Sequence, residues 1–349
     1  MKILYLSSHA VLEFDEIKLL TELGHQVFSM GIYQSANVAN HMRPAVPNLF
    51  EDDRLRELSL NSTKDNLHPE LINWADLILM MHNTRIKIED HPQPWLDNNW
   101  KMIKDKKVVW RSIGQSTRQI EESLKPFRKQ GLKIVRYSPF ETNIPEYQGE
   151  DAVIRFYKDP DEYKDWNGTN AQIVNISQAM FGSDTVPSRG DHMAIDIFKQ
   201  VLEGKNWKIF GPNNDNAGEH DGGLLSFEDL KSMLRFNRVF FYTGTRPASY
   251  TLGLIEAMMI GIPIVSVGPK FGDNVYRDQK SFEVHEIIGK SGEAGFWSDD
   301  INQLREYCDL LINEYEVAKQ VSEKGRARAI ELFGKQTISK QWEEFFNKL

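Results

Sequence analysis

Short, continuous runs of apolar residues alternate with segments of helical periodicity along the whole chain, and this alternation limits the fold more than any other feature. In the first half, the apolar runs occupy residues 3–6, 27–30, 75–81, 108–110 and 134–137. After the first run, Phe14, Ile17 and Leu20 recur at helical spacing and Gly24 follows as a helix stop. Buried strands separated by helices are typical of a parallel sheet covered on both faces.

The second half repeats this pattern after a polar stretch at residues 148–168. Its apolar runs fall at 172–176, 207–210, 239–242 and 262–267, and its helical segments at 193–202, 227–234 and 252–259. A long helix is predicted over 301–333, broken near Gly325, and a last helix over 337–346. We therefore expect an α/β chain of two Rossmann-like parallel-sheet domains, 1–150 and 151–336, facing each other across a cleft. The segment of about 337–349 is expected to pack back on the first domain.

Composition excludes several classes of protein. Apolar residues make up 40% and charged residues 26% of the 349 residues, as in ordinary globular proteins. The single cysteine, Cys308, excludes an internal disulfide and a cysteine-rich metal site. The first apolar run is too short for a secretory signal, and no stretch approaches the roughly 20 apolar residues of a membrane span. We expect a cytoplasmic protein, with peripheral attachment at the inner membrane surface left open.

The formal net charge of −8 is unevenly distributed. Residues 101–136 contain eleven basic and three acidic residues, so this segment carries about +8 and the rest of the chain about −16. One interpretation is that this basic segment contacts an anionic surface, either a membrane or DNA. The other is a set of solvated, lysine-rich helix faces.

The first strand-to-helix turn argues against a dinucleotide cofactor. Its residues are Ser7, Ser8, His9 and Ala10, without the glycine triplet that brings a pyrophosphate close to the backbone. The chain also has no Walker lysine motif. A nicotinamide- or flavin-dependent dehydrogenase is therefore not expected.

The most informative segment is 243–266, where a strand ends, a polar loop turns and a helix begins near Thr251. Backbone N–H groups at such a helix start suit a phosphate, and Gly253 allows a ligand to approach the backbone closely. Glu256, in the second turn, can accept hydrogen bonds from ribose hydroxyls. The alternative for Glu256 is that it caps its own helix.

This segment resembles the donor-site signature of nucleotide-sugar glycosyltransferases of the GT-B fold, in the retaining group 1 branch that includes glycogen synthases. The resemblance rests on Gly253, Glu256, Ala257, Gly261, Pro263 and Ser266. It extends to the opening strand and helix that end at Gly24 and His25, to the strand that ends at Gly211, and to the helix start at 226–230.

The resemblance implies a donor site made by the second domain. Glu256 would bind the ribose, and Thr251, Leu252 and Gly253 would present their backbone to the diphosphate or the sugar. Arg189 stands where the family has a diphosphate-neutralising cation, and its guanidinium suits phosphate. Arg246 and Gly211 complete the expected donor-binding set. The alternative for Arg189 is a charge on the loop surface.

Two positions depart from the family pattern. Ala248 replaces the glutamate that usually contacts the transferred sugar, which puts the sugar's identity and the activity in question. In place of the family's histidine in the first domain, the candidates are Gln115, His9 and His82. We therefore predict Arg189, Gln115 and His9 as the catalytic residues.

The acceptor site is expected in the first domain, in loops that follow strands. Its candidate lining residues are Ser8, His9, Glu13, Asp15 and Gln115. Glu13 and Asp15 equally suit the start of a helix, where carboxylates are favourable.

The expected reaction moves a hexose or pentose from a UDP- or GDP-sugar to a hydroxyl acceptor, with retention of configuration and without a protein nucleophile. The acceptor is left open as a glycan, a lipid or a modified DNA base. No tightly bound cofactor and no metal are expected, because Asp159-Pro160-Asp161 fits a turn. The alternatives are a nucleotide-sugar epimerase and a non-catalytic nucleotide-sugar-binding protein. The oligomeric state is left open.

Overall fold

The protein forms two compact units in a computed structural model, which describes residues 1–7, 9–29, 52–62, 67–81, 94–273 and 278–349. Unit 1 comprises Met1–Tyr157 and Gln336–Leu349, and unit 2 comprises Lys158–Lys335. The chain therefore passes between the units twice, after Tyr157 and after Lys335.

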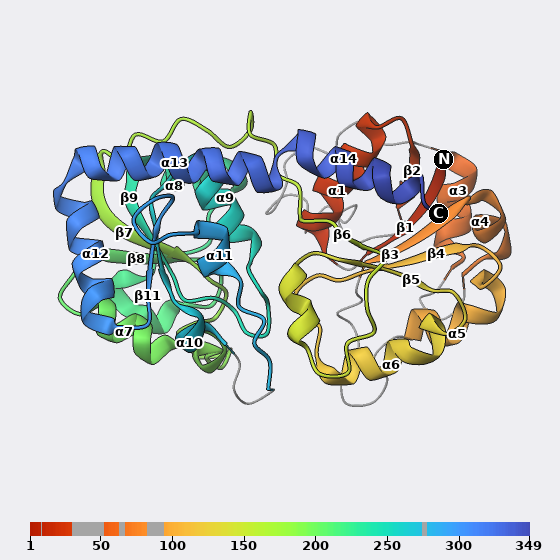
Figure 1. The fold of residues 1–349 in the computed structure, drawn as a ribbon, viewed down its shortest axis with the longest axis horizontal. Helices are drawn as coiled ribbons and strands as arrows, with labels where there is room; N and C mark the ends of the chain where they lie inside the picture. Colours follow the sequence, from red (N-terminus) through yellow and green to blue (C-terminus); the bar gives the residue numbers. More distant parts are fainter. Residues whose placement is uncertain (8, 30–51, 63–66, 82–93, 274–277) are drawn as a thin grey trace. The chain divides into compact units, whose positions relative to one another are not determined.

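Unit 1 is built on a six-stranded parallel sheet with the order β2-β1-β3-β4-β5-β6 (Figure 1). The strands are β1 (Lys2–Leu6), β2 (Gln26–Ser29), β3 (Leu77–Met81), β4 (Lys107–Arg111), β5 (Lys133–Arg136) and β6 (Ala152–Val153). The helices are α1 (Ala10–Glu22), α3 (Asp53–Leu60), α4 (Pro69–Trp74), α5 (Pro94–Ile103), α6 (Arg118–Arg128), the short 3-10 helix η2 (Pro139–Asn143) and α14 (Lys335–Phe346).

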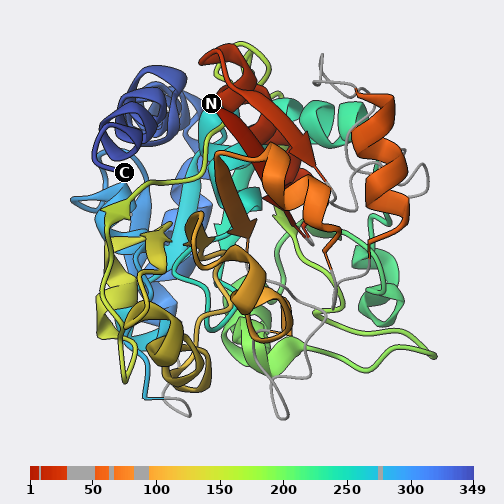
Figure 2. The same ribbon diagram turned by 90° about the vertical axis from the view of Figure 1, so that its right-hand side faces the viewer.

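Both faces of the unit 1 sheet are covered, which explains why its strands read as continuous apolar runs. Leu4, Ile78 and Trp110 belong to the core cluster shared with helices α3 to α6. On the other face, the guanidinium of Arg111 lies 5.5 Å from the ring centre of Trp342 in α14. Helix α14 also brings Phe346 to 5.0 Å from His25, so both ends of the chain lie on this unit (Figures 1 and 2).

Unit 2 has a five-stranded parallel sheet with the order β11-β10-β9-β7-β8. Its strands are β7 (Asn170–Ile176), β8 (Trp207–Phe210), β9 (Asn237–Tyr242), β10 (Ile264–Val267) and β11 (Phe296–Ser298). Its helices are α7 (Ile195–Leu202), α8 (Phe227–Phe236), α9 (Leu252–Ile260), α10 (Pro269–Gly272), α11 (Val284–Ile288), α12 (Ile301–Asn313) and α13 (Tyr315–Phe333), with short 3-10 helices η3 (Gly190–Met193) and η4 (Asp215–His220).

The predicted fold class, two Rossmann-like parallel sheets with interleaved helices, is confirmed. The predicted break near Gly325 is wrong, because the long helical region divides at Glu314 and Gly325 lies inside α13. Gly325 has a packing role instead: a Cβ there would lie 2.8 Å from the carbonyl oxygen of Ala294. The very short strands β6 and β11 were not predicted from the sequence, because two or three residues carry too little periodicity to detect.

Within the part of the chain that the structure describes, no helix combines the length and the apolar character needed to cross a bilayer.

Unit 1 contains a fully buried ion pair between β5 and α6. Arg136 donates to both carboxylate oxygens of Glu121, at 2.6 and 2.8 Å, and both side chains have no exposed surface. Arg136 also donates to the carbonyl of Gly149, and Glu121 accepts from the amide of Gln148. The pair therefore fixes the segment 148–149 to the sheet.

We expect Arg136→Met to lower the free energy of unfolding by about 3–5 kcal/mol, because the Glu121 carboxylate then stays buried without its partner. The double variant Arg136→Met, Glu121→Leu should recover most of this loss, since no unpaired charge is left. Urea denaturation followed by circular dichroism measures both. A single variant as stable as the wild type would contradict the prediction.

Candidate functional site

The topology of unit 2 defines one place for a ligand. From β7 the chain moves to β8 on one side, whereas from β9 it moves through β10 to β11 on the other, and β7 and β9 are neighbours. The loops that follow β7 and β9 therefore diverge at the carboxyl edge of the sheet. Such a switch point is where open α/β sheets bind ligands.

The helix that starts at this switch point, α9, leaves its first N–H groups open. Thr251 stands at the N-cap position, but its hydroxyl accepts a hydrogen bond from the Tyr242 hydroxyl at 3.1 Å and caps no helix amide among the described residues. Thr251, Leu252 and Gly253 are all half-buried. The free amides and the positive end of the helix dipole favour an anion here.

Gly253 is not required by the protein's own packing. A Cβ at this position would meet nothing closer than Ile176 at 3.7 Å, an ordinary van der Waals distance, and the backbone does not adopt a positive φ. Gly211, which follows β8, differs: its φ is +124° and a Cβ would lie 2.4 Å from the carbonyl oxygen of Ser177. Gly211 is therefore needed because the loops after β7 and β8 pass close to each other there, whereas Gly253 leaves space in front of α9.

Glu256 lies one turn further along α9 and is held by two side chains. Its Oε1 accepts from the Lys158 Nζ at 2.6 Å and from the Tyr163 hydroxyl at 3.3 Å. Lys158 is fully buried, while the Glu256 side chain keeps 9% of its surface exposed. The other carboxylate oxygen, Oε2, makes no hydrogen bond within the described residues. Sequence analysis missed Lys158 and Tyr163, because they lie more than 90 residues from Glu256, in a polar segment whose only noted pattern was the Asp159-Pro160-Asp161 turn.

The two predicted arginines occupy different situations. Arg189 lies in the loop after β7, is exposed, and its side chain makes no ion pair with any described residue. Arg246 donates to the backbone carbonyls of Asp191 in η3 and of Phe271 and Gly272 in α10, so it ties its own loop to these two short helices. Burial lowers the pKa of Arg246. Arg189 is thus available to bind an anion, whereas Arg246 holds the neighbouring backbone segments in place.

The loop that contains Ala248 is anchored from the chain segment before α11. Ser281 donates to the Pro247 carbonyl at 3.0 Å, and the Glu283 amide donates to the Ser249 carbonyl at 3.1 Å. These bonds fix the backbone on both sides of Ala248, which itself is half-buried.

In unit 1, His9 and Gln115 follow β1 and β4 at the carboxyl edge of the sheet, whereas the prediction that Glu13 and Asp15 lie in a loop is wrong, because both are inside α1. His9 is the N-cap of α1, and its Nδ1 accepts from the Leu12 amide at 3.5 Å. Gln115 is half-buried in the loop after β4. Glu13 and Asp15 are buried, and Glu13 accepts from the Ser29 hydroxyl. Ser8 and His82 lie outside the described residues.

A buried carboxylate that the sequence analysis did not identify supports the Gln115 loop. Ser112 donates to Glu141 Oε2 at 2.5 Å, and the Tyr137 amide donates to the same oxygen at 3.3 Å. Burial raises the pKa of Glu141, and the nearby Arg136 guanidinium and the Ser112 hydroxyl partly offset this effect. Glu141 therefore links the loops after β4 and β5.

The basic segment 101–136 divides into structural and free charges. Arg111 and Arg136 are buried in ion pairs with Glu16 and Glu121, and Asp151 binds two further basic side chains. Five lysines are exposed and make no ion pair with a described residue: Lys101, Lys104, Lys107, Lys125 and Lys129. They lie on or after the ends of α5 and α6 that lead into β4 and β5, toward the amino edge of the sheet. His9 and Gln115, predicted from the sequence to line an acceptor site, lie at the opposite edge.

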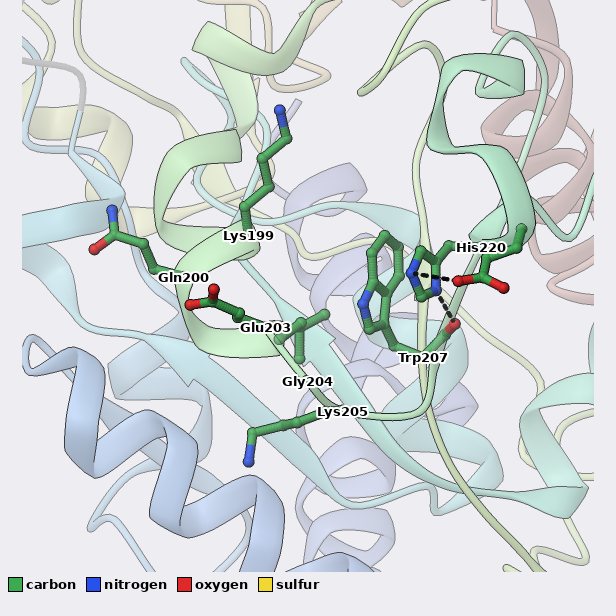
Figure 3. A pocket seen from close by; sticks show the side chains of 9 residues that line it. Lys199, Gln200, Glu203, Gly204, Lys205, Trp207 and His220 are labelled. Carbon is green, nitrogen blue, oxygen red and sulfur yellow. Dashed lines mark hydrogen bonds and ion pairs between the residues drawn. The ribbon is translucent and has the colours of Figure 1, made fainter.

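A hollow of about 650 Å³ in unit 2 lies away from the switch point (Figure 3). It is lined by the end of α7, the start of β8 and the η4 residues Glu219 and His220. His220 stacks on Trp207 with 3.8 Å between ring centres, and its Nδ1 lies 3.1 Å from the Trp207 carbonyl (Figure 3). The lining of this hollow includes the amino end of β8 and none of the donor-site residues predicted from the sequence.

Asp159, Pro160 and Asp161 form a local turn. Asp159 Oδ1 accepts from the Asp161 amide at 2.9 Å, which is the turn predicted from the sequence. Across the described ranges, no three His, Cys, Asp or Glu side chains gather in a way that could hold a metal ion.

Comparisons with known proteins give matches in structure alone. No known protein-family profile matches the chain, and a sequence comparison with curated proteins finds no match. Among solved structures, the chain is similar over 100% of both chains to Anabaena Alr3699/HepE in complex with UDP-glucose, at 15% identity and a TM-score of 0.63.

Two further structures are similar over almost their whole length. A glycosyltransferase from Rickettsia africae matches over 99% of this chain and 98% of its own, at 14% identity and a TM-score of 0.66. An alpha-glucosyltransferase in complex with UDP-glucose and DNA containing an abasic site matches over 99% of both chains, at 12% identity and a TM-score of 0.62. The chain therefore has the GT-B fold that the sequence predicts.

Alanine substitutions at the two glycines should have opposite effects on stability. We expect Gly253→Ala to raise the free energy of unfolding by about 0.5–1 kcal/mol, because alanine favours the helix and meets no obstacle. Gly211→Ala should lower it by more than about 1 kcal/mol, because of its positive φ and the contact with Ser177. Chemical denaturation of both variants tests this, and destabilisation by Gly253→Ala would show that the space before α9 is smaller than described.

The raised pKa of Glu141 predicts a pH-dependent stability. A carboxyl whose pKa is higher in the folded state stabilises the fold below its unfolded pKa of about 4.3, and this contribution is lost as the pH rises. The free energy of unfolding of Glu141→Gln should therefore improve relative to the wild type between pH 4 and pH 8. Urea titrations across this range measure the difference, and a constant difference would contradict the assignment.

Proposed function

We propose that this protein is a glycosyltransferase that moves a sugar from a nucleoside-diphosphate sugar to a hydroxyl acceptor. The observation that carries the proposal is the start of α9 at the switch point of unit 2. There, open helix amides, the unobstructed Gly253 and the partly exposed Glu256 lie within one turn of each other. Support comes from the fold shared with structures that contain UDP-glucose.

In this proposal, unit 2 is the donor domain and each group has one task. The α9 amides and the exposed guanidinium of Arg189 bind the diphosphate, whose negative charge grows as the sugar leaves. Glu256 accepts hydrogen bonds from the ribose hydroxyls. Arg246 acts on the site indirectly, because its hydrogen bonds to three carbonyls set the positions of the loops. Gly211 keeps the loops after β7 and β8 close together.

We propose a transfer with retention of configuration. The donor phosphate assists deprotonation of the acceptor, so no protein nucleophile is needed. Neutralisation of the diphosphate by Arg189 and the helix dipole takes the place of a divalent metal. The donor is a UDP- or GDP-sugar, used as a co-substrate.

Unit 1 is proposed as the acceptor domain. His9 and Gln115 follow β1 and β4 at the carboxyl edge of its sheet, and Glu141 braces the loop of Gln115. The five free lysines lie toward the amino edge, so an anionic membrane or DNA bound there would contact the side away from the acceptor loops. We therefore favour a soluble glycan or other small hydroxyl acceptor, and a cytoplasmic location, which the single buried thiol of Cys308 suits.

Ala248 supports a second candidate, a protein that binds nucleotide sugars without turning them over. The usual glutamate at this position would contact the transferred sugar, and alanine offers no polar atom. Incubation with UDP-glucose and GDP-mannose separates the candidates: slow release of free sugar indicates a transferase, and binding without release indicates a binding protein. Inversion of the sugar would indicate an epimerase.

Two substitutions test the donor site. Arg189→Ala and Glu256→Gln should each weaken binding of UDP or GDP by tenfold or more, because each removes a charged hydrogen-bonding group worth about 1.5–3 kcal/mol. Isothermal titration calorimetry measures the affinities. Lys319→Ala, an exposed change on α13, is the matched control and should bind like the wild type. If both site variants bind nucleotide normally, the donor site lies elsewhere.

A further inference from the structure

Lys158 is a fully buried cation that the proposed reaction does not use. Its Nζ lies 2.6 Å from Glu256 Oε1 and 5.3 Å from the ring centre of Tyr163, whose hydroxyl donates to the same oxygen at 3.3 Å. Both contacts fall on Oε1, and Oε2 carries none from a described residue. The carboxylate is thus anchored at one oxygen and open at the other.

We propose that Lys158 and Tyr163 are positioning residues that hold Glu256 so that its Oε2 receives the hydroxyls of a ribose, which makes the site selective for ribonucleotides over 2′-deoxyribonucleotides. The inference rests on the proposed function and adds the basis of its nucleoside specificity. A carboxylate fixed before binding loses no side-chain entropy when the ligand arrives.

The two positioning residues are themselves fixed. The Lys158 amide donates to the Phe333 carbonyl at 3.1 Å, at the end of α13. Arg326, in the same helix, donates to the carbonyls of Tyr163 and Pro160 at 2.6 and 2.9 Å. The segment 158–163 is therefore fastened to α13 at both ends, and its two side chains reach Glu256 from a rigid backbone.

The anchored carboxylate also explains how selectivity arises. An ionised carboxylate has only acceptor sites, so it suits vicinal hydroxyl donors. A 2′-deoxyribose supplies one donor fewer and leaves one acceptor site of the partly buried Oε2 unfilled, which costs affinity. A mobile glutamate could instead turn its carboxylate to solvent when a 2′-deoxyribonucleotide binds, so little affinity would be lost.

The test compares the affinities for UDP and 2′-deoxy-UDP, and for GDP and 2′-deoxy-GDP, by isothermal titration calorimetry. The wild type should prefer the ribonucleotide by roughly tenfold or more. Lys158→Met should abolish most of this preference, mainly by weakening the ribonucleotide. In a Glu256→Gln background, Lys158→Met should change the preference no further, because the two residues act through one carboxylate.

The matched control is Lys231→Met, which removes another largely buried lysine whose Nζ lies 2.7 Å from a glutamate, Glu228 in α8. It should leave the preference unchanged. Should Lys158→Met fail to fold, Tyr163→Phe carries the test, and it should reduce the preference by a smaller factor because the ion pair remains.

Two results would overturn the inference while leaving the proposed function standing: a wild type that binds UDP and 2′-deoxy-UDP equally, or a Lys158→Met variant that keeps the full preference. A wild type that binds neither UDP nor GDP would overturn the proposed function itself.

Discussion

The parallel sheets, covered on both faces, determine where this protein can do chemistry. Strands buried on both sides are mostly apolar and keep only the polar groups that find a buried partner, so most polar side chains and open amides lie in the loops at the carboxyl edges. In unit 2, the reversal of strand order between β7 and β9 opens this edge and brings the start of α9 to it. The loop before α9, its anchoring hydrogen bonds and the close contact at Gly211 all lie at this edge.

Charge inside the protein is handled by pairing. Arg111 with Glu16, Arg136 with Glu121 and Lys158 with Glu256 are ion pairs whose cations have no exposed surface. A buried charge without a partner is costly, so these pairs restrict which loop conformations can exist. The first two pairs lie in unit 1, and the pair in unit 2 contains the residue proposed to bind the nucleotide. The difference lies in exposure, because the Glu256 side chain keeps 9% of its surface exposed, against 2% for Glu16 and none for Glu121.

The sequence predicted the features that depend on local pattern. Apolar runs located nine of the strands, and the sequence from Thr251 to Gly261 predicted a helix with the observed cap positions. The sequence could not reveal that the Tyr242 hydroxyl donates a hydrogen bond to the Thr251 hydroxyl, or that Lys158 forms an ion pair with Glu256. Such contacts depend on how distant segments pack. Glycine patterns were ambiguous for the same reason. Gly325 resembled a helix break, yet its role is close packing inside a continuous helix. The roles of Arg189, Gln115 and His9 in the reaction stay predictions.

The double passage of the chain between the units affects the order in which the protein can be made. Helix α14 supplies Trp342, which covers the Arg111 side of the unit 1 sheet, but the ribosome reaches it only after all of unit 2. Unit 1 therefore emerges first, with α1 but not yet α14 on the Arg111 side of its sheet, while unit 2, a single continuous stretch, is synthesised and can fold. Helix α14 then completes unit 1, so this part of its core forms only after unit 2 has been synthesised.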